Sequence, residues 1–595
     1  MSGHRPFSEL LKDFSPERLQ AIDEESARLR AEFLERHPKL ADPEYVKARA
    51  DAIFDAWDRG DRVQAEILIN GGNGMKYDYI VVGGGSAGCT IATRLSEDPA
   101  KSVLLLEAGP DYPDFETLPD DLKLGNNVWF SAYGPHSWAY RGHITDEQPD
   151  LEIPRGKATG GSSAINGQVL YRGVPDDYNR WAQWGNDEWG FTNCLPYFNK
   201  METDLDFGGS DFHGSEGPVP VRRAPRTEWL PHAVAFEQAA LAEGFEISED
   251  MNDPESTGVS PRARNTLNFK GSSGVRMSMA LNYLDMARHR LNFTIRGSVV
   301  CRRILFDGKK AVGVEAESGG DVFVVEGEEI ILSSGAVASP QILMLSGVGP
   351  KDHLERLGIQ VVHESPGVGK NLRDHPSAAA IYQAHGDKPD VQAPVIQVGL
   401  RYQVPGSPLE NDMQLSPMLM TSEHRPAQVT IDEDLNYIGM SASLQLALGQ
   451  GELTLQSADP HEQPFINYNY YQDPEDLRRM REAIRLGVRM AENHEHYKDI
   501  IIERIMPTDE ELSDDDALDL WLKRNSGTSH HISGTCKMGP DSDPLSVVDQ
   551  HLRVKGVEGL RVADASIMPD CIRANTNATT IMIGERCADF IKDGK

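Results

Sequence analysis

The segment YDYIVVGGGSAGCTIATRL, residues 77–95, combines a short apolar run, a glycine-rich turn and a helix-length stretch. It predicts a buried parallel strand followed by a tight turn and a helix. Gly83, Gly85 and Gly88 have the spacing G-x-G-x-x-G. The first glycine allows the tight turn, the second lets a pyrophosphate approach the backbone, and the third lets the helix pack closely on the strand. The segment therefore predicts a dinucleotide-binding site at the start of this helix.

The residues after the turn support this interpretation. The run SVLLLEAGP, residues 102–110, predicts a second buried strand, so the two strands and the helix form a βαβ unit. Glu107 ends this strand 19 residues after Gly88, where its carboxylate can accept hydrogen bonds from a ribose 2′-hydroxyl. The acid disfavours NADP, whose 2′-phosphate it would repel. Ser86 and Ala87, at the start of the helix, are also expected to bind the cofactor. The motif alone does not distinguish NAD from FAD.

Residues 1–75 precede this unit and form a separate N-terminal extension. The triplets SPE at 15–17 and DPE at 42–44 each predict a helix start, with a capping residue followed by proline at the first helical position. The sequence NGGNG at 70–74 predicts a flexible joint. We expect a two-helix arm, with three roles open: packing on its own main domain, self-association into a homo-oligomer, or regulation.

The composition argues against several classes of partner. There are 59 Lys and Arg against 92 Asp and Glu, a formal charge of −33, which repels nucleic-acid backbones and anionic lipid heads. The six cysteines form no C-x-x-C pair, so we expect neither a metal site nor a disulfide framework. No apolar run approaches the ~20 residues that span a bilayer. The first residues lack the apolar core of a signal peptide, so we expect a cytoplasmic protein without membrane partners.

A chain of 595 residues is too long for a single hydrophobic core, and its later segments predict a second kind of architecture. Residues 291–336 predict successive short strands with turns at DG 307–308 and GG 319–320. Residues 376–460, with runs such as PVIQVGLRYQV and ELTLQS, predict an antiparallel sheet, and residues 473–493 predict a capped helix. We therefore expect an α/β protein, with a Rossmann-like domain and a second domain built on an antiparallel sheet.

Four separated segments resemble the glucose–methanol–choline (GMC) family of flavin oxidoreductases in order and in spacing. They are YDYIVVGGGSAGCTIATRLSED with VLLLEAGP, PRGKATGGSSAINGQVLYRG at 154–173, GAVASPQILMLSGVGP at 335–350 with PGVGKNLRDHP at 366–376, and HHISGTCKMG at 530–539 with GLRVADASIMPDCIRANTNATTIMIGERCADFI at 559–591. The resemblance runs from about residue 76 to 592 and implies FAD as the cofactor. It implies an FAD-binding domain assembled from residues 76–200, 290–375 and 545–592, and a substrate-binding domain assembled from residues 201–289 and 376–544.

The resemblance also implies where each part of FAD lies. The pyrophosphate would lie at the turn from Gly83 to Gly88, and the ribose at Glu107. The other implied cofactor-binding residues are Gly161, Asn166 and Gly167 nearest the isoalloxazine, Val299 at the adenine through its backbone, Asp564 and Ala565 at the pyrophosphate and ribitol, and Asn577 beside the flavin. Some relatives carry a histidine within GGSSAIN that attaches FAD covalently. Here that position is Ile165, so we expect non-covalent FAD.

Alcohol oxidation by a flavin needs a base for the hydroxyl proton, an acceptor at flavin N5 for the α-hydrogen as hydride, and a hydrogen bond for the developing alkoxide. Histidine suits the base, because its pKa lies near neutral. Through the family's H-x-x-G-T pattern, the resemblance implies that His531 is the base and Asn575 its partner. His530 is expected to point elsewhere, since successive side chains of an extended chain diverge, and His375 is expected to be structural.

The sequence thus predicts an FAD-dependent oxidase or dehydrogenase of primary or secondary alcohols. An FAD-containing lyase of cyanohydrins and a flavin photodecarboxylase of fatty acids are the alternatives, and the electron acceptor, oxygen or another carrier, stays open. No acid can be placed against a quaternary ammonium, so choline is not predicted as the small-molecule substrate. Five residues suit either an apolar pocket wall or the core: Trp129, Phe130, Tyr133, Met418 and Met420.

Overall fold

The computed structural model of the chain describes residues 76–595, apart from 127, 270–271, 387–392, 421–431 and 433–434. The predicted helical arm, residues 1–75, lies outside the described residues. The described part contains two seven-stranded sheets, four smaller sheets and the helices around them, which confirms the expected α/β class. Its helices include none that is long and apolar enough to cross a membrane.

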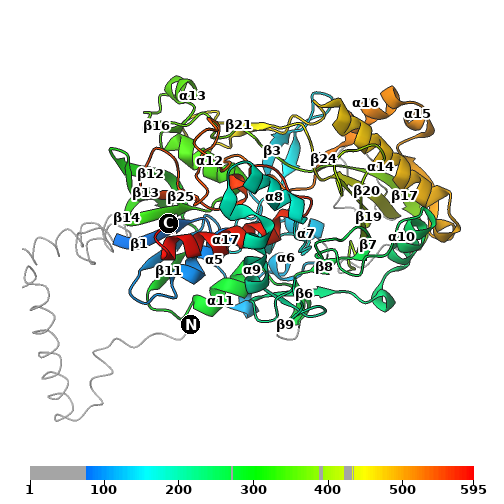
Figure 1. Cartoon of the computed structure of the whole chain (residues 1–595), viewed down its shortest axis with the longest axis horizontal. Coiled ribbons are helices and arrows are strands. Elements are labelled where there is room, and N and C mark those ends of the chain that lie inside the picture. Colours follow the sequence, from blue (N-terminus) through cyan, green and yellow to red (C-terminus); the bar gives the residue numbers. More distant parts are fainter. Residues whose placement is uncertain (1–75, 127, 270–271, 387–392, 421–431, 433–434) are drawn as a thin grey trace, which may run out of the picture. The chain divides into compact units, whose positions relative to one another are not determined.

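The first sheet is mixed and contains the predicted βαβ unit (Figure 1). β1 (Lys76–Val82) leads into the glycine turn, α5 (Ser86–Leu95) returns, and β2 (Val103–Leu106) pairs with β1 in parallel. The strand order is β11-β2-β1-β14-β13-β12, with β25 beside β14. The other strands are β11 (Phe293–Arg296), β12 (Val300–Asp307), β13 (Lys310–Ser318), β14 (Asp321–Leu332) and β25 (Leu560–Val562).

Five strands of this sheet are parallel: β1, β2, β11, β14 and β25. Their carboxyl ends therefore meet at one edge of the sheet. β12, β13 and β14 form an antiparallel meander, and its turns contain Gly308 and Gly319 with φ of +60° and +61°, as predicted for residues 291–336. Because ligands of open α/β sheets bind outside the carboxyl ends of the strands, this edge is where a cofactor is expected.

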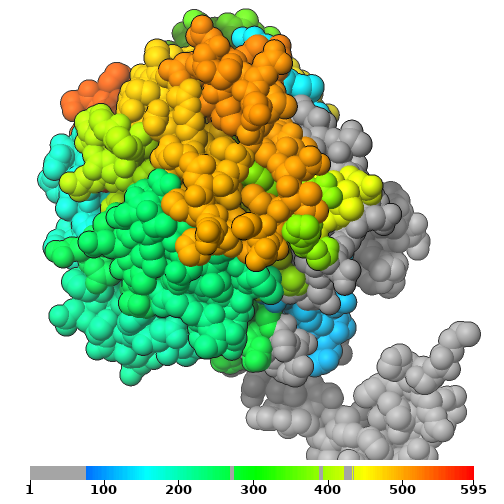
Figure 2. Space-filling view, turned by 90° about the vertical axis from the view of Figure 1, so that its right-hand side faces the viewer, coloured from blue at the N-terminus to red at the C-terminus, as the bar shows by residue number. Residues whose placement is uncertain are grey.

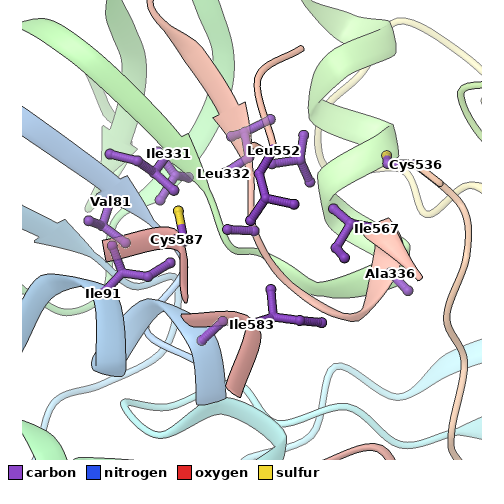
Figure 3. Packing of buried hydrophobic residues seen from close by; sticks show 14 of the residues in the cluster. Val81, Ile91, Ile331, Leu332, Ala336, Cys536, Leu552, Ile567, Ile583 and Cys587 are labelled. Atoms are coloured by element: carbon purple, nitrogen blue, oxygen red, sulfur yellow. The ribbon is translucent and has the colours of Figure 1, made fainter. Parts of the chain in front are cut away.

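Helix α17 (Thr576–Lys592) packs directly against α5 below the first sheet. Figure 3 shows Ile583 of α17 and Ile91 of α5 in the same buried cluster as Val81 of β1. The two helices approach closely because Gly584 has no side chain: a Cβ there would lie 2.9 Å from the carbonyl oxygen of Ala87. The first turns of the two helices also lie side by side, because the Ser86 hydroxyl in α5 hydrogen-bonds the Asn577 side chain in α17.

The second sheet is antiparallel, as predicted for residues 376–460, and its strand order is β23-β17-β20-β19-β18-β7. Side chains alternate between its faces. Leu415 and Met440 belong to an apolar cluster with helix α14 (Pro474–Glu492), whereas Gln414 and Ser441 point to the opposite face. The strands are β7 (Gly258–Pro261), β17 (Pro376–Ala384), β18 (Val398–Tyr402), β19 (Met413–Met420), β20 (Asn436–Leu444) and β23 (Ile501–Met506), and the short β24 (Gly527–Thr528) pairs with β17.

Helix α14 begins as predicted, because the Asp473 side chain accepts a hydrogen bond of 2.9 Å from the N–H of Glu475 and Pro474 takes the first helical position. In Figure 2, α14 and its neighbours form the yellow-to-orange surface beside the green surface that contains α10 (Pro231–Ala242). The run ELTLQS departs from the prediction. It forms β21 (Glu452–Thr454) in a separate four-stranded sheet, because it pairs with β22 (Phe465–Asn467) rather than with β20.

The strands of the first sheet come from residues 76–106, 293–332 and 560–562, and those of the second from residues 258–261, 376–444, 501–506 and 527–528. The division into FAD-binding and substrate-binding domains at the expected boundaries stays a prediction. The remaining helices are α6 (Asp120–Lys123), α7 (Val128–Ala132), α8 (Pro175–Gln183), α9 (Phe191–Met201), α11 (Asp285–Ala287), α12 (Gly335–Leu345), α13 (Lys351–Arg356), α15 (Asp509–Leu512) and α16 (Asp515–Asn525). The remaining strands are β3 (Tyr140–His143), β4 (Leu151–Ile153), β5 (Glu202–Asp204), β6 (Val219–Arg223), β8 (Ala263–Arg264), β9 (Thr266–Phe269), β10 (Ser272–Arg276), β15 (Val348–Gly349) and β16 (His363–Glu364).

Candidate functional site

A large cavity of about 910 Å³ is lined by the carboxyl edge of the first sheet and by one face of the second. The structure brings nearly all the sequence-predicted site residues to its wall, and only Gly88 stands behind that wall. Those that line it are Gly83, Gly85, Ser86, Ala87, Glu107, Gly161, Asn166, Gly167, Val299, His531, Asp564, Ala565, Asn575 and Asn577. Residues from distant parts of the chain thus meet at one site.

The three glycines of the turn meet different steric demands. A Cβ on Gly83, whose φ is +102°, would lie 2.5 Å from the carbonyl oxygen of Ser333, and a Cβ on Gly88 would lie 1.8 Å from that of Gly83. Both positions are too crowded for a side chain, as the motif requires. Gly85 differs, because a Cβ there would have only the Ser333 oxygen, at 3.9 Å, beside it and would face the cavity. Its bare backbone is where a phosphate can approach.

Three helices begin at the cavity wall: α5 at Ser86, α12 at Gly335 and α17 at Thr576. The hydroxyl of Ser86 donates a hydrogen bond of 2.7 Å to the side-chain oxygen of Asn577, which joins the first turns of α5 and α17. The free N–H groups and the positive dipole ends of helix amino termini favour anions. This end of the cavity therefore suits a diphosphate.

Two buried carboxylates accept hydrogen bonds from the backbone at the cavity end where the three helices begin. Glu107 accepts hydrogen bonds from the N–H groups of Gly84 and Gly109, both of 2.8 Å. Burial raises the pKa of Glu107 to about 7, although these N–H groups act in the opposite direction. Asp564 accepts a hydrogen bond of 2.9 Å from the N–H of Gly335. The two acids thus fix the loops that follow β2, β14 and β25.

The loop of residues 156–167 closes over the glycine turn. The N–H of Gly160 donates a hydrogen bond of 2.7 Å to the carbonyl of Gly84. A Cβ on Gly161, whose φ is +52°, would lie 2.6 Å from the Cα of Gly85, so only a glycine permits this approach. Loop, turn and helix ends together form a cradle of exposed backbone that fits a dinucleotide.

His531 and Asn575 form a polar pair in the cavity wall. The Nδ2 atom of Asn575 lies 3.0 Å from Nε2 of His531. Asn575 is the N-cap residue of α17, so its side chain stands at the amino end of that helix. A hydroxyl group that contacts both side chains could donate its proton to the imidazole and accept a hydrogen bond from the amide. The pair can therefore take a proton and stabilise the oxygen that loses it.

His531 is held from behind by two residues of the segment before β17. Its Nδ1 lies 2.9 Å from Nδ1 of His375, and its backbone N–H donates a hydrogen bond of 2.8 Å to the carboxylate of Asp374. Because Nδ1 is shared with His375, Nε2 is the atom that faces Asn575. Sequence reasoning gave His375 a structural role and missed this contact. The only signal in the sequence was its place in LRDHP, within one of the segments that resemble the family.

The surroundings keep His531 neutral. Burial, and after it the charge that His375 would carry, lower the pKa of His531 well below 6.5. Burial also lowers the pKa of His530, to about 3. His530 has a φ of +65° and lines the cavity, so the extended backbone assumed for it was wrong. A neutral imidazole can accept a proton, which a base requires.

The second sheet supplies a polar floor, defined as its cavity-lining side chains on β17, β19 and β20 and directly after β20. These are Ser377, Ala379, Gln414, Ser416, Met418, Met420, Ser441, Ser443 and Gln445, with Ala378 and Gly439 beside them. Among the apolar residues proposed from the sequence, Trp129, Tyr133, Met418 and Met420 line the cavity, whereas Phe130 is 39% exposed and does not. Sequence reasoning missed the polar members, although the alternation in MQLSPMLM, residues 413–420, was their signal.

Outside the cavity, Glu202, Asp204 and His213 lie close enough together to hold a metal ion. Burial would lower the pKa of His213, but its hydrogen bonds to Asp204, Asp250 and Glu202 outweigh burial and raise it to about 10. A protonated imidazole has no free lone pair for a metal. Arg223 adds a second positive charge through its ion pair of 3.0 Å with Asp204. The cluster is therefore an ion-pair network.

Known proteins match most of the chain. Family models described as GMC oxidoreductase match residues 77–377 with an N-terminal model and residues 447–584 with a C-terminal model. The oxygen-dependent choline dehydrogenase of Escherichia coli (strain K12) is 38% identical over 552 residues, which cover 87% of this chain and 96% of that protein. Pyridoxine 4-oxidase from Mesorbium loti is 28% identical, with a TM-score of 0.79, over 86% of this chain and 98% of its own. A formate oxidase is 26% identical, with a TM-score of 0.79, over 88% of this chain and 99% of its own.

Proposed function

The chain belongs to the GMC oxidoreductase family and is an FAD-dependent oxidoreductase of alcohols, and from this premise we propose the roles of its cavity residues. His531 is the base that takes the hydroxyl proton of the substrate. Asn575 is the donor that stabilises the oxygen as its charge develops. The observation that carries this assignment is the 3.0 Å contact between Nδ2 of Asn575 and Nε2 of His531 at the cavity wall.

The proposed sequence of events begins with the substrate hydroxyl between His531 and Asn575. When bound, FAD supplies a hydride acceptor at N5 of its isoalloxazine ring. Neutral His531 accepts the hydroxyl proton at Nε2, while the hydrogen bond from Asn575 strengthens as the oxygen becomes an alkoxide. His375 acts as a positioning residue, because its contact with Nδ1 of His531 leaves Nε2 directed at the substrate.

The cradle at the other end of the cavity is proposed to bind the rest of FAD. Its backbone and its helix ends would hold the pyrophosphate, and Glu107 the ribose. The proposed contacts are Gly83, Gly85, Ser86, Ala87 and Gly88 as the pyrophosphate turn, Val299 at the adenine, Asp564 and Ala565 at the pyrophosphate and ribitol, and Gly161, Asn166, Gly167 and Asn577 around the isoalloxazine.

FAD is proposed to be non-covalent, because Ile165 lines the cavity with a side chain that has no nucleophilic atom. Denaturing the yellow holoenzyme with acid and removing the precipitate should leave all flavin absorbance in the supernatant. Mass spectrometry of the precipitated chain should give the unmodified mass. A pellet that stays yellow, or a chain heavier by one flavin, would show a covalent bond at another residue.

The activity itself is tested by following the flavin absorbance while alcohols are added without oxygen. An alcohol substrate should bleach the yellow colour, since reduction removes the absorbance of oxidised flavin. The relatives named above oxidise their substrates according to their names, so the lyase and photodecarboxylase alternatives are not favoured. Admitting oxygen afterwards distinguishes an oxidase, which regains its colour, from an enzyme that needs another carrier. If a broad panel of primary and secondary alcohols leaves the flavin oxidised, the proposed reaction is wrong.

A further inference from the structure

Arg262 follows β7 and places a buried guanidinium in the cavity wall. It is only 6% exposed and lies 4.9 Å from the ring centre of Tyr171. One terminal nitrogen donates a hydrogen bond of 3.1 Å to the amide oxygen of Gln414, and the other donates to the hydroxyl of Ser416. Its Nε–H has no partner, and within the described part of the chain no carboxylate forms an ion pair with it. A buried charge without a counter-ion is costly, so its presence calls for an explanation.

The sheet is shaped to receive this guanidinium. Arg262 is tied to the edge of β18 by its backbone N–H, which donates a hydrogen bond of 2.9 Å to the carbonyl of Gln397. On β18, a Cβ at Gly399 would lie 2.4 Å from a terminal nitrogen of Arg262. Only the missing side chain of Gly399 therefore lets the guanidinium lie flat against the strand.

A chain of hydrogen bonds on the polar floor links Arg262 to the segment that carries the base. The amide nitrogen of Gln414 donates to Gln445 at 3.2 Å, and Gln445 donates to Ser443 at 2.9 Å. The hydroxyls of Ser443 and Ser529 are 2.9 Å apart, and Ser529 lies two residues before His531. The oxygen of Gln414 must then point at Arg262, because its nitrogen is used elsewhere. The guanidinium is thus held in one orientation at the wall that also holds the catalytic pair.

We propose that Arg262 binds an anionic group of the substrate, so that the preferred substrates are alcohols that also carry a carboxylate. This inference rests on the proposed function and names its substrate class. A carboxylate in the cavity would accept hydrogen bonds from the N–H bonds of the two terminal nitrogens that Gln414 and Ser416 leave unused, and it would supply the missing counter-charge. The four carboxylates in the cavity wall come from other segments and leave Arg262 unpaired: Glu107, Glu152, Glu462 and Asp564.

The same arrangement disfavours a cationic alcohol. A quaternary ammonium beside Arg262 would place a second positive charge next to a buried guanidinium, where like charges repel more strongly than in water. The formal charge of −33 on the whole chain acts in the opposite direction and repels anions. Exposed charges are screened within about 8 Å at physiological ionic strength, whereas a buried contact is screened much less. Recognition inside the cavity is therefore set by Arg262 rather than by the outer surface.

The first test compares two ions that share a phenyl ring but carry opposite charges, on the FAD-loaded enzyme. Benzoate and benzyltrimethylammonium are titrated while the flavin spectrum and the melting temperature are followed. Benzoate should bind at least about tenfold more tightly, since a hydrogen-bonded charge pair contributes on the order of a factor of ten or more. In Arg262→Gln the preference should vanish, and in Arg262→Lys it should persist in part. Tighter binding of the ammonium ion, or an unchanged preference in Arg262→Gln, would overturn the proposal.

Arg155→Gln is the matched control for Arg262→Gln. Arg155 also lines the cavity without a carboxylate partner among the described residues, and it donates a hydrogen bond of 2.9 Å to the carbonyl of His530. Arg155→Gln should keep the preference for benzoate; if it removes the preference while Arg262→Gln does not, the anion site lies elsewhere. Flavin content and melting temperature show that each variant is folded.

Activity separates this inference from the function on which it rests. The anaerobic rate of bleaching is compared for 4-(hydroxymethyl)benzoate, benzyl alcohol and choline. We expect the carboxylate to have the highest kcat/KM, and Arg262→Gln to lower that value at least tenfold while changing the value for benzyl alcohol less than threefold. If choline or benzyl alcohol is preferred, the substrate class is wrong but alcohol oxidation stands. If none of the three and no alcohol of the broad panel bleaches the flavin, the proposed reaction itself fails, whatever the ions show.

Discussion

Replacing His531 with alanine should slow the reduction of the flavin by a good alcohol substrate about 10²- to 10⁴-fold, the range typical for loss of a general base. Its Nε2 lies 3.0 Å from Nδ2 of Asn575 and its backbone is held by Asp374, so the side chain contributes chemistry rather than support. FAD should stay bound, because the cradle residues are untouched. Stopped-flow absorbance under nitrogen measures the rate directly.

His494→Ala is the matched control, since His494 hydrogen-bonds Glu243 at 2.9 Å and does not line the cavity. It should react like the unaltered enzyme. If His531→Ala keeps the full rate of flavin reduction with every good alcohol, the base is another residue.

The dependence on pH gives the same assignment a second readout. Protonated His531 cannot accept the hydroxyl proton, so kcat/KM should fall as the pH drops through the pKa of this group. Because burial, and then His375, lower that pKa well below 6.5, full activity should persist below pH 6.5 and be lost only in more acidic solution. If kcat/KM already falls when the pH is lowered from 8 to 7, His531 is not the buried, neutral base that we propose. In His531→Ala the acidic limb should disappear.

The cofactor end of the site could be predicted because its determinants are local. Gly83 and Glu107 are 24 residues apart and belong to one βαβ unit, in which strand, turn and helix dictate each other's positions. The catalytic pair was reached through family resemblance, since neither His531 nor Asn575 has sequence neighbours that reveal its partner.

The positions of Trp129 and Tyr133 in the cavity wall follow from helix geometry. Residues four apart share a face, and their rings stack at 6.3 Å, whereas Phe130 is rotated away from them.

The contacts of His375 and Arg262 could not be predicted, because they depend on which strands become neighbours. The contact between His375 and His531 spans 156 positions of the chain, and that between Arg262 and Gln414 spans 152. Alternation along β19 indicates that Gln414 and Ser416 share a face. It does not say whether that face meets helix α14 or the cavity, since that choice is made by the packing of the whole sheet.

Substitutions in the glycine turn should also have large effects, and these should differ between Gly85 and Gly88. One position needs a glycine for FAD binding, and the other needs it for folding. Gly88→Ala should strongly impair folding or leave a protein with little FAD. Its Cβ would lie 1.8 Å from the carbonyl oxygen of Gly83, and only a shift of α5 away from β1 could relieve that contact. Gly85→Ala should fold normally, since its Cβ meets nothing closer than 3.9 Å. It should nevertheless bind FAD at least about tenfold more weakly, because the methyl group lies where the phosphate must approach.

The comparison uses three variants, with Gly190→Ala as the control because a Cβ there makes only ordinary contacts of 3.7 and 3.8 Å. Soluble yield, the melting temperature of the FAD-free protein and the affinity for added FAD are measured for each. Gly88→Ala should lose yield and melting temperature, Gly85→Ala should lose only FAD affinity, and Gly190→Ala should lose neither. Full FAD occupancy in Gly85→Ala would show that the pyrophosphate does not approach this backbone. Because the loss in Gly85→Ala is confined to cofactor binding, that variant separates the cofactor role of the turn from its part in the fold.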